Sequence, residues 1–188
     1  MSTRTQIRFI GPYGEVRQVY RHNDGYPDEI IADLVELFDV MDRTGTRRGA
    51  SYAAANFVFF DKLRRMKMYY SAEAEDRRDS RFRTDKIDTN DPHRVLDPSE
   101  FAQFDQPSFL LGNGVENGGK WHGDEEWLYE VDHFVDGVNV RVAGRDDFPR
   151  FEDLDKLVSD DPWGEIQWSF DGALEEAYDR FIERQQKI

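Results

Sequence analysis

Two short polar clusters contain the side chains best suited to proton transfer and metal binding. His22 and Asp24 lie within the sequence Arg-His-Asn-Asp-Gly-Tyr-Pro, directly after a stretch typical of a β-strand. His122, Asp124 and Glu126 lie within His-Gly-Asp-Glu-Glu, directly before another such stretch. If the two stretches are neighbouring strands, the clusters meet at one edge of a sheet.

Imidazole and carboxylate groups together suit a divalent metal ion or a general acid–base pair. In a metal site, the predicted ligands are His22, Asp24, His122 and Asp124, with Glu126 as the candidate catalytic base. The corresponding function is a metal-dependent hydrolase of phosphate esters. The His-x-Asp spacing does not select this function, because it is common and differs from the established zinc spacings.

The same clusters also have two explanations that need no metal. Asp24 and Gly25 form a natural turn, and Tyr26-Pro27 suits the entry into a helix, so the polarity of the first cluster can be purely structural. Alternatively, the clusters line a cleft for a small anionic ligand such as a nucleotide. The predicted ligand-binding residues are then Arg21, His22, Asp24, Tyr26, His122 and Asp124.

A basic stretch at 62–86 offers a surface for nucleic acid. It carries nine Lys or Arg residues against five acidic ones, within a strongly acidic chain. Basic and aromatic side chains together suit a phosphate backbone and stacked bases. The alternative is a helix surface and a solvated loop that balance acidic neighbours, and we favour it. The candidate phosphate contacts are Arg77, Arg78, Arg81 and Arg83.

The elements that must position these residues follow from apolar spacing. Two strand pairs, each around a Gly-containing turn, read as β-hairpins, and a further alternating stretch suggests a fifth strand. The order of strands and helices predicts an α+β fold with a mainly antiparallel sheet, built from two hairpins and covered by helices. The predicted strands are Thr5–Ile10, Glu15–Arg21, Trp127–Phe134, Val138–Ala143 and the stretch at 166–170. The predicted helices are one that begins at Pro27 and ends near Arg43–Gly45, one at Ser51–Tyr70 and one at Ala173–Gln185.

The length of 188 residues suits one domain, in which a charged insertion at about 71–92 and a Gly-rich connection at 112–119 are predicted to be flexible. The 39 acidic residues outnumber the 25 basic ones, and the net charge is −14. This acidity disfavours nonspecific binding to nucleic acid or to anionic membranes. The excess of Asp and the scarcity of Lys indicate a halophilic protein of an archaeon or of its virus.

Cysteine is absent, which excludes disulfides and thiolate chemistry. No apolar run is long enough to span a membrane, and the first residues lack a signal segment. We therefore expect a cytoplasmic protein, or a component of a virion. The Trp and Tyr content also permits a homo-oligomer.

Three motifs carry a resemblance to a known group of proteins. They are Ser-Thr-Arg at 2–4, Tyr-Arg-His-Asn-Asp-Gly-Tyr-Pro at 20–27, and His-Gly-Asp-Glu-Glu-Trp-Leu-Tyr-Glu-Val at 122–131. In their order and spacing the chain resembles small proteins of phages, plasmids, bacteria and archaea that carry no assigned activity. Asn23, Glu125 and Trp127 differ from the residues typical of that group. The resemblance implies one fold around the motifs and no mechanism.

Three functions remain open on these grounds. The leading expectation is a binding or interaction protein of a virus, a mobile element or a haloarchaeal host, without catalysis. Its partner is either a protein or a small anionic ligand. The metal-dependent hydrolase is the first alternative, and nucleic-acid binding through 62–86 is the second.

Overall fold

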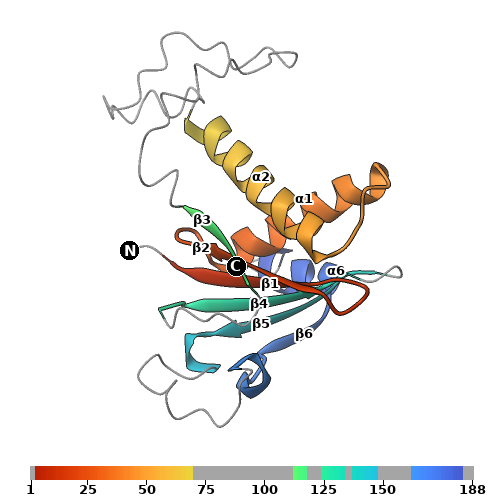
Figure 1. Cartoon of the computed structure of the whole chain (residues 1–188). Coiled ribbons are helices and arrows are strands. Elements are labelled where there is room, and N and C mark those ends of the chain that lie inside the picture. Colours follow the sequence, from red (N-terminus) through yellow and green to blue (C-terminus); the bar gives the residue numbers. More distant parts are fainter. Residues whose placement is uncertain (1–2, 70–111, 118–123, 134–136, 148–161, 184–188) are drawn as a thin grey trace.

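The computed structural model describes residues 3–69, 112–117, 124–133, 137–147 and 162–183 (Figure 1). These residues form one six-stranded sheet and three α-helices, which confirms the predicted α+β class. The strands are β1 (Thr5–Ile10), β2 (Val16–Arg21), β3 (Asn113–Asn117), β4 (Trp127–Asp132), β5 (Asn139–Gly144) and β6 (Phe170–Ala173). The helices are α1 (Pro27–Arg43), α2 (Ala50–Tyr69) and α6 (Leu174–Tyr178).

The sheet is mixed, with the strand order β3-β2-β1-β4-β5-β6. Both predicted hairpins are present, since β1 pairs with β2 and β4 pairs with β5, each in an antiparallel arrangement. A parallel pairing of β1 with β4 joins the two hairpins at the centre of the sheet. This parallel contact and the added strand β3 distinguish the observed topology from the predicted one.

Helix α1 begins where the sequence predicts it. Pro27 occupies the first turn, where its missing N–H costs no hydrogen bond, and Asp28 and Glu29 lie at the positive end of the helix dipole. The helix ends before Gly45, whose φ of 62° is the left-handed conformation that glycine adopts readily. Its buried stripe consists of Ile30, Ile31, Leu34, Leu37, Phe38 and Met41.

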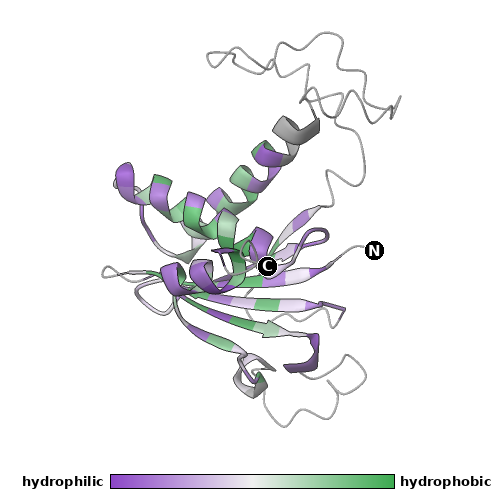
Figure 2. Ribbon diagram, turned by 180° about the vertical axis from the view of Figure 1, so that it is seen from behind, coloured by the Kyte–Doolittle hydropathy of each residue, from purple (hydrophilic) through white to green (hydrophobic). Residues whose placement is uncertain are grey.

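The main core lies between the helices and one face of the sheet. Alternate residues of the central strands, such as Ile7, Phe9 and Val131, point to this face and are completely buried. Helices α1, α2 and α6 contribute their apolar sides to the same cluster. The hydrophobic bands on the strands and on the inner sides of α1 and α2 are visible in Figure 2.

A smaller apolar cluster covers part of the opposite face of the sheet. Trp163 and Trp168 stack with their rings 6.2 Å apart, and Ile166 packs with them against β4 and β5. The sequence predicted Ile166 and Trp168 as part of a fifth strand, which was wrong. The strand β6 begins later, at Phe170, and 162–165 form a 3-10 turn instead.

Two further predictions need correction. The Gly-rich stretch at 112–119, predicted as a flexible connection, contains β3, which pairs with β2. The predicted final helix is α6, followed by a π-helical turn at 179–183. The predicted insertion at 71–92 lies outside the described residues. Among the described helices, none combines the length and the apolar character needed to cross a membrane.

Candidate functional site

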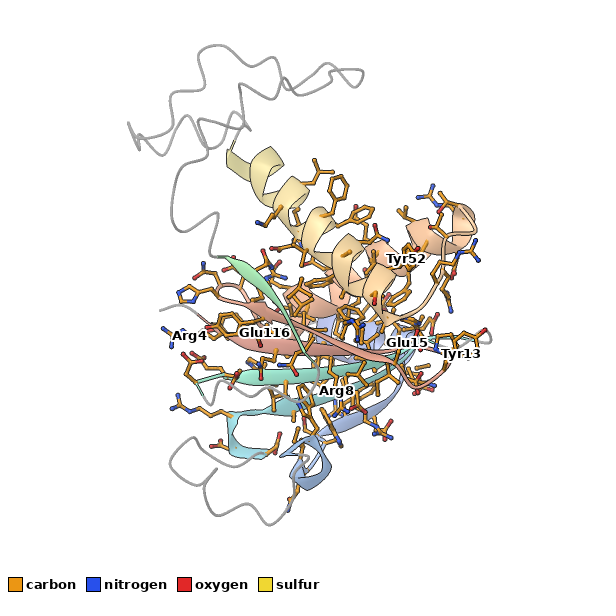
Figure 3. The ribbon with its side chains drawn as sticks, viewed as in Figure 1. Arg4, Arg8, Tyr13, Glu15, Tyr52 and Glu116 are labelled. Carbon is orange, nitrogen blue, oxygen red and sulfur yellow. The ribbon has the colours of Figure 1, made fainter. Side chains whose placement is uncertain are left out.

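The two polar clusters meet at one end of the sheet. Thr5, at the start of β1, pairs with Arg21 at the end of β2 and with Trp127 at the start of β4. The chain that leaves β2 and the chain that enters β4 therefore flank the N-terminal end of β1. Figure 3 shows Arg4 at this end, while Tyr13 and Glu15 lie at the other. We call the polar groups gathered here the sheet-end surface: Arg4, Tyr20, His22, Asp24, Asp124 and Glu126.

The turn in the first cluster is built by close backbone contacts. Asp24 has a φ of 55°, a left-handed conformation that Asp tolerates better than most residues. The next residue, Gly25, donates its N–H to the carbonyl of Thr3 at 3.1 Å. A Cβ on Gly25 would lie 2.8 Å from Cβ of Thr5, so only glycine fits here. Tyr129 closes the contact from β4, since its hydroxyl donates to the carbonyl of Gly25 at 2.9 Å.

The second cluster is fixed against the start of β1 in a similar way. The N–H of Glu126 donates to the carbonyl of Arg4 at 2.9 Å, and the hydroxyl of Thr5 donates to the carbonyl of Trp127 at 2.7 Å. The guanidinium of Arg4 then forms an ion pair with Asp124 at the surface. Arg4 thus contacts the second cluster, while the preceding residue, Thr3, contacts Gly25 in the first.

The pKa of Tyr20 responds to burial and to several charged groups near this surface. Burial, followed by the negative charges of Asp124, Glu125 and Glu116, raises its pKa to about 12, while Arg4 acts in the opposite direction. The hydroxyl of Tyr20 lies 3.3 Å from Nδ1 of His22. Among the described residues, the carboxylates of Asp124, Glu125 and Glu116 thus act on Tyr20 against the guanidinium of Arg4.

Arg21, which the sequence predicted as part of a ligand site, points into the protein instead. Its side chain is 3% exposed and lies between α1 and α2. Nη1 donates to Asp33 at 2.6 Å, Nη2 lies 3.3 Å from Asp61, and Nε donates to the carbonyl of Asn23 at 2.9 Å. Arg64 forms a second ion pair with Asp33. We call Arg21, Asp33, Asp61 and Arg64 the buried ion cluster.

The sequence did not single out Asp33 and Asp61 as partners of Arg21. A signal for both was nevertheless present. Asp33 adjoins the apolar stripe of α1, and Asp61 follows Phe57 by one helical turn in α2. A carboxylate on the inner side of a helix needs a buried cation or hydrogen-bond donors.

The remaining predicted site residues fall into two groups. Tyr26 is half exposed and precedes α1 as its N-cap residue, without a side-chain capping bond. His122 and the four arginines of the nucleic-acid prediction, Arg77, Arg78, Arg81 and Arg83, lie outside the described residues. Within the described ranges, no three His, Asp or Glu side chains are arranged to hold a metal ion. The metal site and the nucleic-acid surface therefore stay predictions.

Three cavities among the described residues lie away from the sheet-end surface. The largest, of about 770 Å³, lies beside the second half of α1. A second, of about 220 Å³, lies between α1 and α2 next to Asp33, Asp61 and Arg64. The third, of about 200 Å³, lies over Glu130 and Asp132 on the sheet face opposite the helices. None of the three was predicted from the sequence.

Glu130 and Asp132 are two of the acidic residues in the third cavity, and Glu130 has a structural explanation. Burial raises the pKa of both carboxyls. Arg141 donates to Glu130 at 2.9 Å, and Arg8 lies 3.6 Å from the same carboxyl. The two arginines thus balance the charge of Glu130 on this face.

Comparisons with known proteins found no matching family model, no matching curated protein and no matching solved structure. The resemblance in the three motifs therefore stays a prediction, and the function must be argued from the geometry.

Proposed function

We propose that this chain is a binding protein that recognises a basic segment of a partner protein through its sheet-end surface. The observation that supports the proposal is the meeting of the two polar clusters, a hundred residues apart in the sequence, at one end of the sheet. Backbone contacts define the turn at Gly25 and the entry into β4, while the side chains of Arg4 and Asp124 stay partly exposed.

The charge at this surface favours a cationic partner over the anionic ligand expected from the sequence. Asp24, Asp124 and Glu126 contribute carboxylates, and the guanidinium of Arg4 is engaged with Asp124. Burial is the main cause of the raised pKa of Tyr20, and the carboxylates of Asp124, Glu125 and Glu116 raise it further. Lysine or arginine side chains of a partner would meet carboxylates here, whereas a phosphate would be repelled.

The shape of the surface favours a protein partner over a small molecule. None of the three described cavities is lined by residues of the sheet-end surface. Small ligands are usually bound in concave pockets that cover most of their surface, whereas protein partners bind flatter polar surfaces. A haloarchaeal host or its virus would supply such a partner in concentrated salt. There, only direct ion pairs contribute, because the Debye length is about 3 Å at 1 M salt.

Selection of binding peptides from a random library tests this proposal. We expect the selected peptides to be rich in Lys and Arg and to bind the Asp24→Asn/Asp124→Asn variant at least about tenfold more weakly. Asn is suitable at position 24 because it also tolerates a positive φ. The matched control is Asp171→Asn/Asp179→Asn, because Asp171 is likewise an exposed partner of an arginine, away from this end of the sheet.

Two results would contradict the proposal. One is a set of peptides without basic residues, and the other is equal binding of a selected peptide to both double variants. Measuring at 0.15 M and at 1 M salt, values chosen to span about a threefold change in Debye length, separates direct ion pairs from long-range attraction.

The metal-dependent hydrolase is the second candidate, because His22, Asp24 and Asp124 lie at the same end of the sheet. The described side chains alone are not arranged to hold a metal ion, so this candidate requires His122 as a ligand. Calorimetric titration with Zn²⁺ or Mn²⁺ tests it directly. A hydrolase of this kind requires one tight site that is lost in His122→Ala. Absence of binding in the unaltered protein would exclude this candidate and leave the peptide-binding proposal unaffected.

A further inference from the structure

The cavity of about 770 Å³ lies at the end of the sheet opposite the sheet-end surface. It is enclosed by the second half of α1, the connection to α2, the start of β5 and the start of α6. Its volume of about 770 Å³ is within the range of small-molecule sites, which is roughly 300–1,000 Å³. The cavity is thus large enough for an organic ligand.

The walls of this cavity are apolar. Val35, Phe38 and Met41 line it from α1, where their spacing puts them on one side of the helix. Val138 and Leu174 line it from the sheet and from α6. All five side chains also contact the main core, so the walls are held by packing. A ligand with an apolar body would bury its surface against them.

Two glycines are among the lining residues of the cavity. Gly45 follows the end of α1 in a left-handed conformation, and Gly137 has a φ of 156° beside the start of β5. Neither position carries a side chain that could narrow the cavity.

The charged groups that line the cavity are mainly acidic. Asp39, Asp42 and Glu175 face one guanidinium, that of Arg47. Arg47 is already held in place, since Nε donates to Asp42 at 2.6 Å and Nη1 donates to the carbonyl of Gly137 at 3.1 Å. Its guanidinium also lies 5.5 Å from the ring centre of Phe38. Arg47 thus balances Asp42 and forms part of the wall.

Two carboxylates remain to receive a ligand. Asp39 pairs with Arg43 at 3.1 Å, but both side chains are about two-thirds exposed, and such pairs contribute little. Glu175 forms no ion pair with any other described residue, and it lies in the first turn of α6, beside the apolar wall residue Leu174. A cation bound next to Leu174 would be the first positive partner of Glu175 within the described part of the chain.

We propose that this cavity binds a small organic cation with an apolar body, an alkyl- or arylammonium compound. The apolar walls would cover the body of the ligand, and Glu175, together with Asp39, would neutralise its ammonium group. An anion is disfavoured, because the guanidinium of Arg47 is engaged and three carboxylates surround the cavity. This site is separate from the sheet-end surface and does not depend on the proposed function.

Titration with three matched probes tests the proposal: phenethylammonium, the neutral 2-phenylethanol and the anionic 3-phenylpropionate. Binding is followed by NMR chemical shifts of the backbone amides of α1 and α6 in low salt. We expect phenethylammonium to bind about fivefold or more tightly than the alcohol, with shifts around Val138 and Leu174, and the carboxylate to bind most weakly.

The variant Glu175→Gln should weaken the binding of phenethylammonium about fivefold and leave the binding of the alcohol unchanged. The matched control is Glu176→Gln, the same change one residue further along α6, because Glu176 does not line the cavity. Melting temperatures confirm that both variants fold. Equal binding of the amine and the alcohol, equal effects of the two variants, or no shifts at millimolar amine would each overturn the proposal.

Discussion

Replacing Arg21 by Met should destabilise the protein by about 3–5 kcal/mol, the usual cost of removing one partner of a buried ion pair. Arg21 lies within hydrogen-bonding or ion-pair distance of two carboxylates, Asp33 at 2.6 Å and Asp61 at 3.3 Å, and all three side chains are largely buried. At an effective dielectric constant of about 20, each unit-charge attraction at about 3–4 Å is worth roughly 4–5 kcal/mol before desolvation is counted.

The loss of stability in Arg21→Met should come mainly from the changed surroundings of Asp61. Asp33 keeps its ion pair with Arg64 in the variant, whereas Asp61 loses the guanidinium beside it. Adding Asp61→Asn to Arg21→Met removes the second buried charge and should therefore recover part of the lost stability. Together with the single variant Asp61→Asn, these proteins form a double-mutant cycle, for which we expect a coupling energy of about 1–3 kcal/mol.

Urea unfolding followed by circular dichroism measures these differences without adding salt. The control is Arg43→Met, since Arg43 and Asp39 form an exposed pair one helical turn apart, for which we expect a loss of about 0.5 kcal/mol or less. If Arg21→Met costs no more than this control, the buried ion cluster does not hold α1 and α2 to β2, and our reasoning about it fails.

Three further outcomes are expected from single substitutions. Gly25→Ala should cost about 1–3 kcal/mol in urea unfolding, because the added methyl group overlaps the neighbouring chain, whereas Gly114→Ala, with nothing within 4 Å, should cost less. Burial lowers the pKa of His133 in the folded protein. The free energy of unfolding should therefore fall as the pH drops through the pKa of this histidine in the unfolded chain, about 6.5. His133→Leu should weaken this dependence in unfolding curves measured at several pH values. Asp124→Asn should lower the pKa of Tyr20, measured by NMR titration of the ring, and an unchanged pKa would disprove our account of the charge at this surface.

The local elements could be predicted from the sequence because each has its own periodic pattern. Val138, Val140 and Val142 alternate in the sequence, and all three are buried in or next to β5. Helix α1 has Pro27 at its start and a clear apolar stripe, and it ends at Arg43, within the range predicted for its end. Such a pattern arises because one face of a strand or helix packs against the core. Residues close together in the sequence are therefore enough to reveal it.

The parallel pairing of β1 with β4 could not be predicted, because it joins segments more than a hundred residues apart. No local pattern specifies which strands are neighbours. Strand β3 was missed for a related reason: Val115 is its one apolar residue, and it is a strand because it pairs with β2. Trp168 alternates with Phe170 in the sequence, but it packs with Trp163 on the other face of the sheet.

The parallel pairing also explains what the two polar clusters have in common. Because β1 and β4 run in the same direction and β2 runs against them, the exit from β2 and the entry into β4 must lie at the same end of the sheet. Gly25 and Tyr129 are then needed to pack one cluster against the other, so much of the motif around Gly25 has a structural role. Asp24 and the pair of Arg4 with Asp124 contribute little to that packing and stay partly exposed, and these are the side chains on which recognition of a partner would depend.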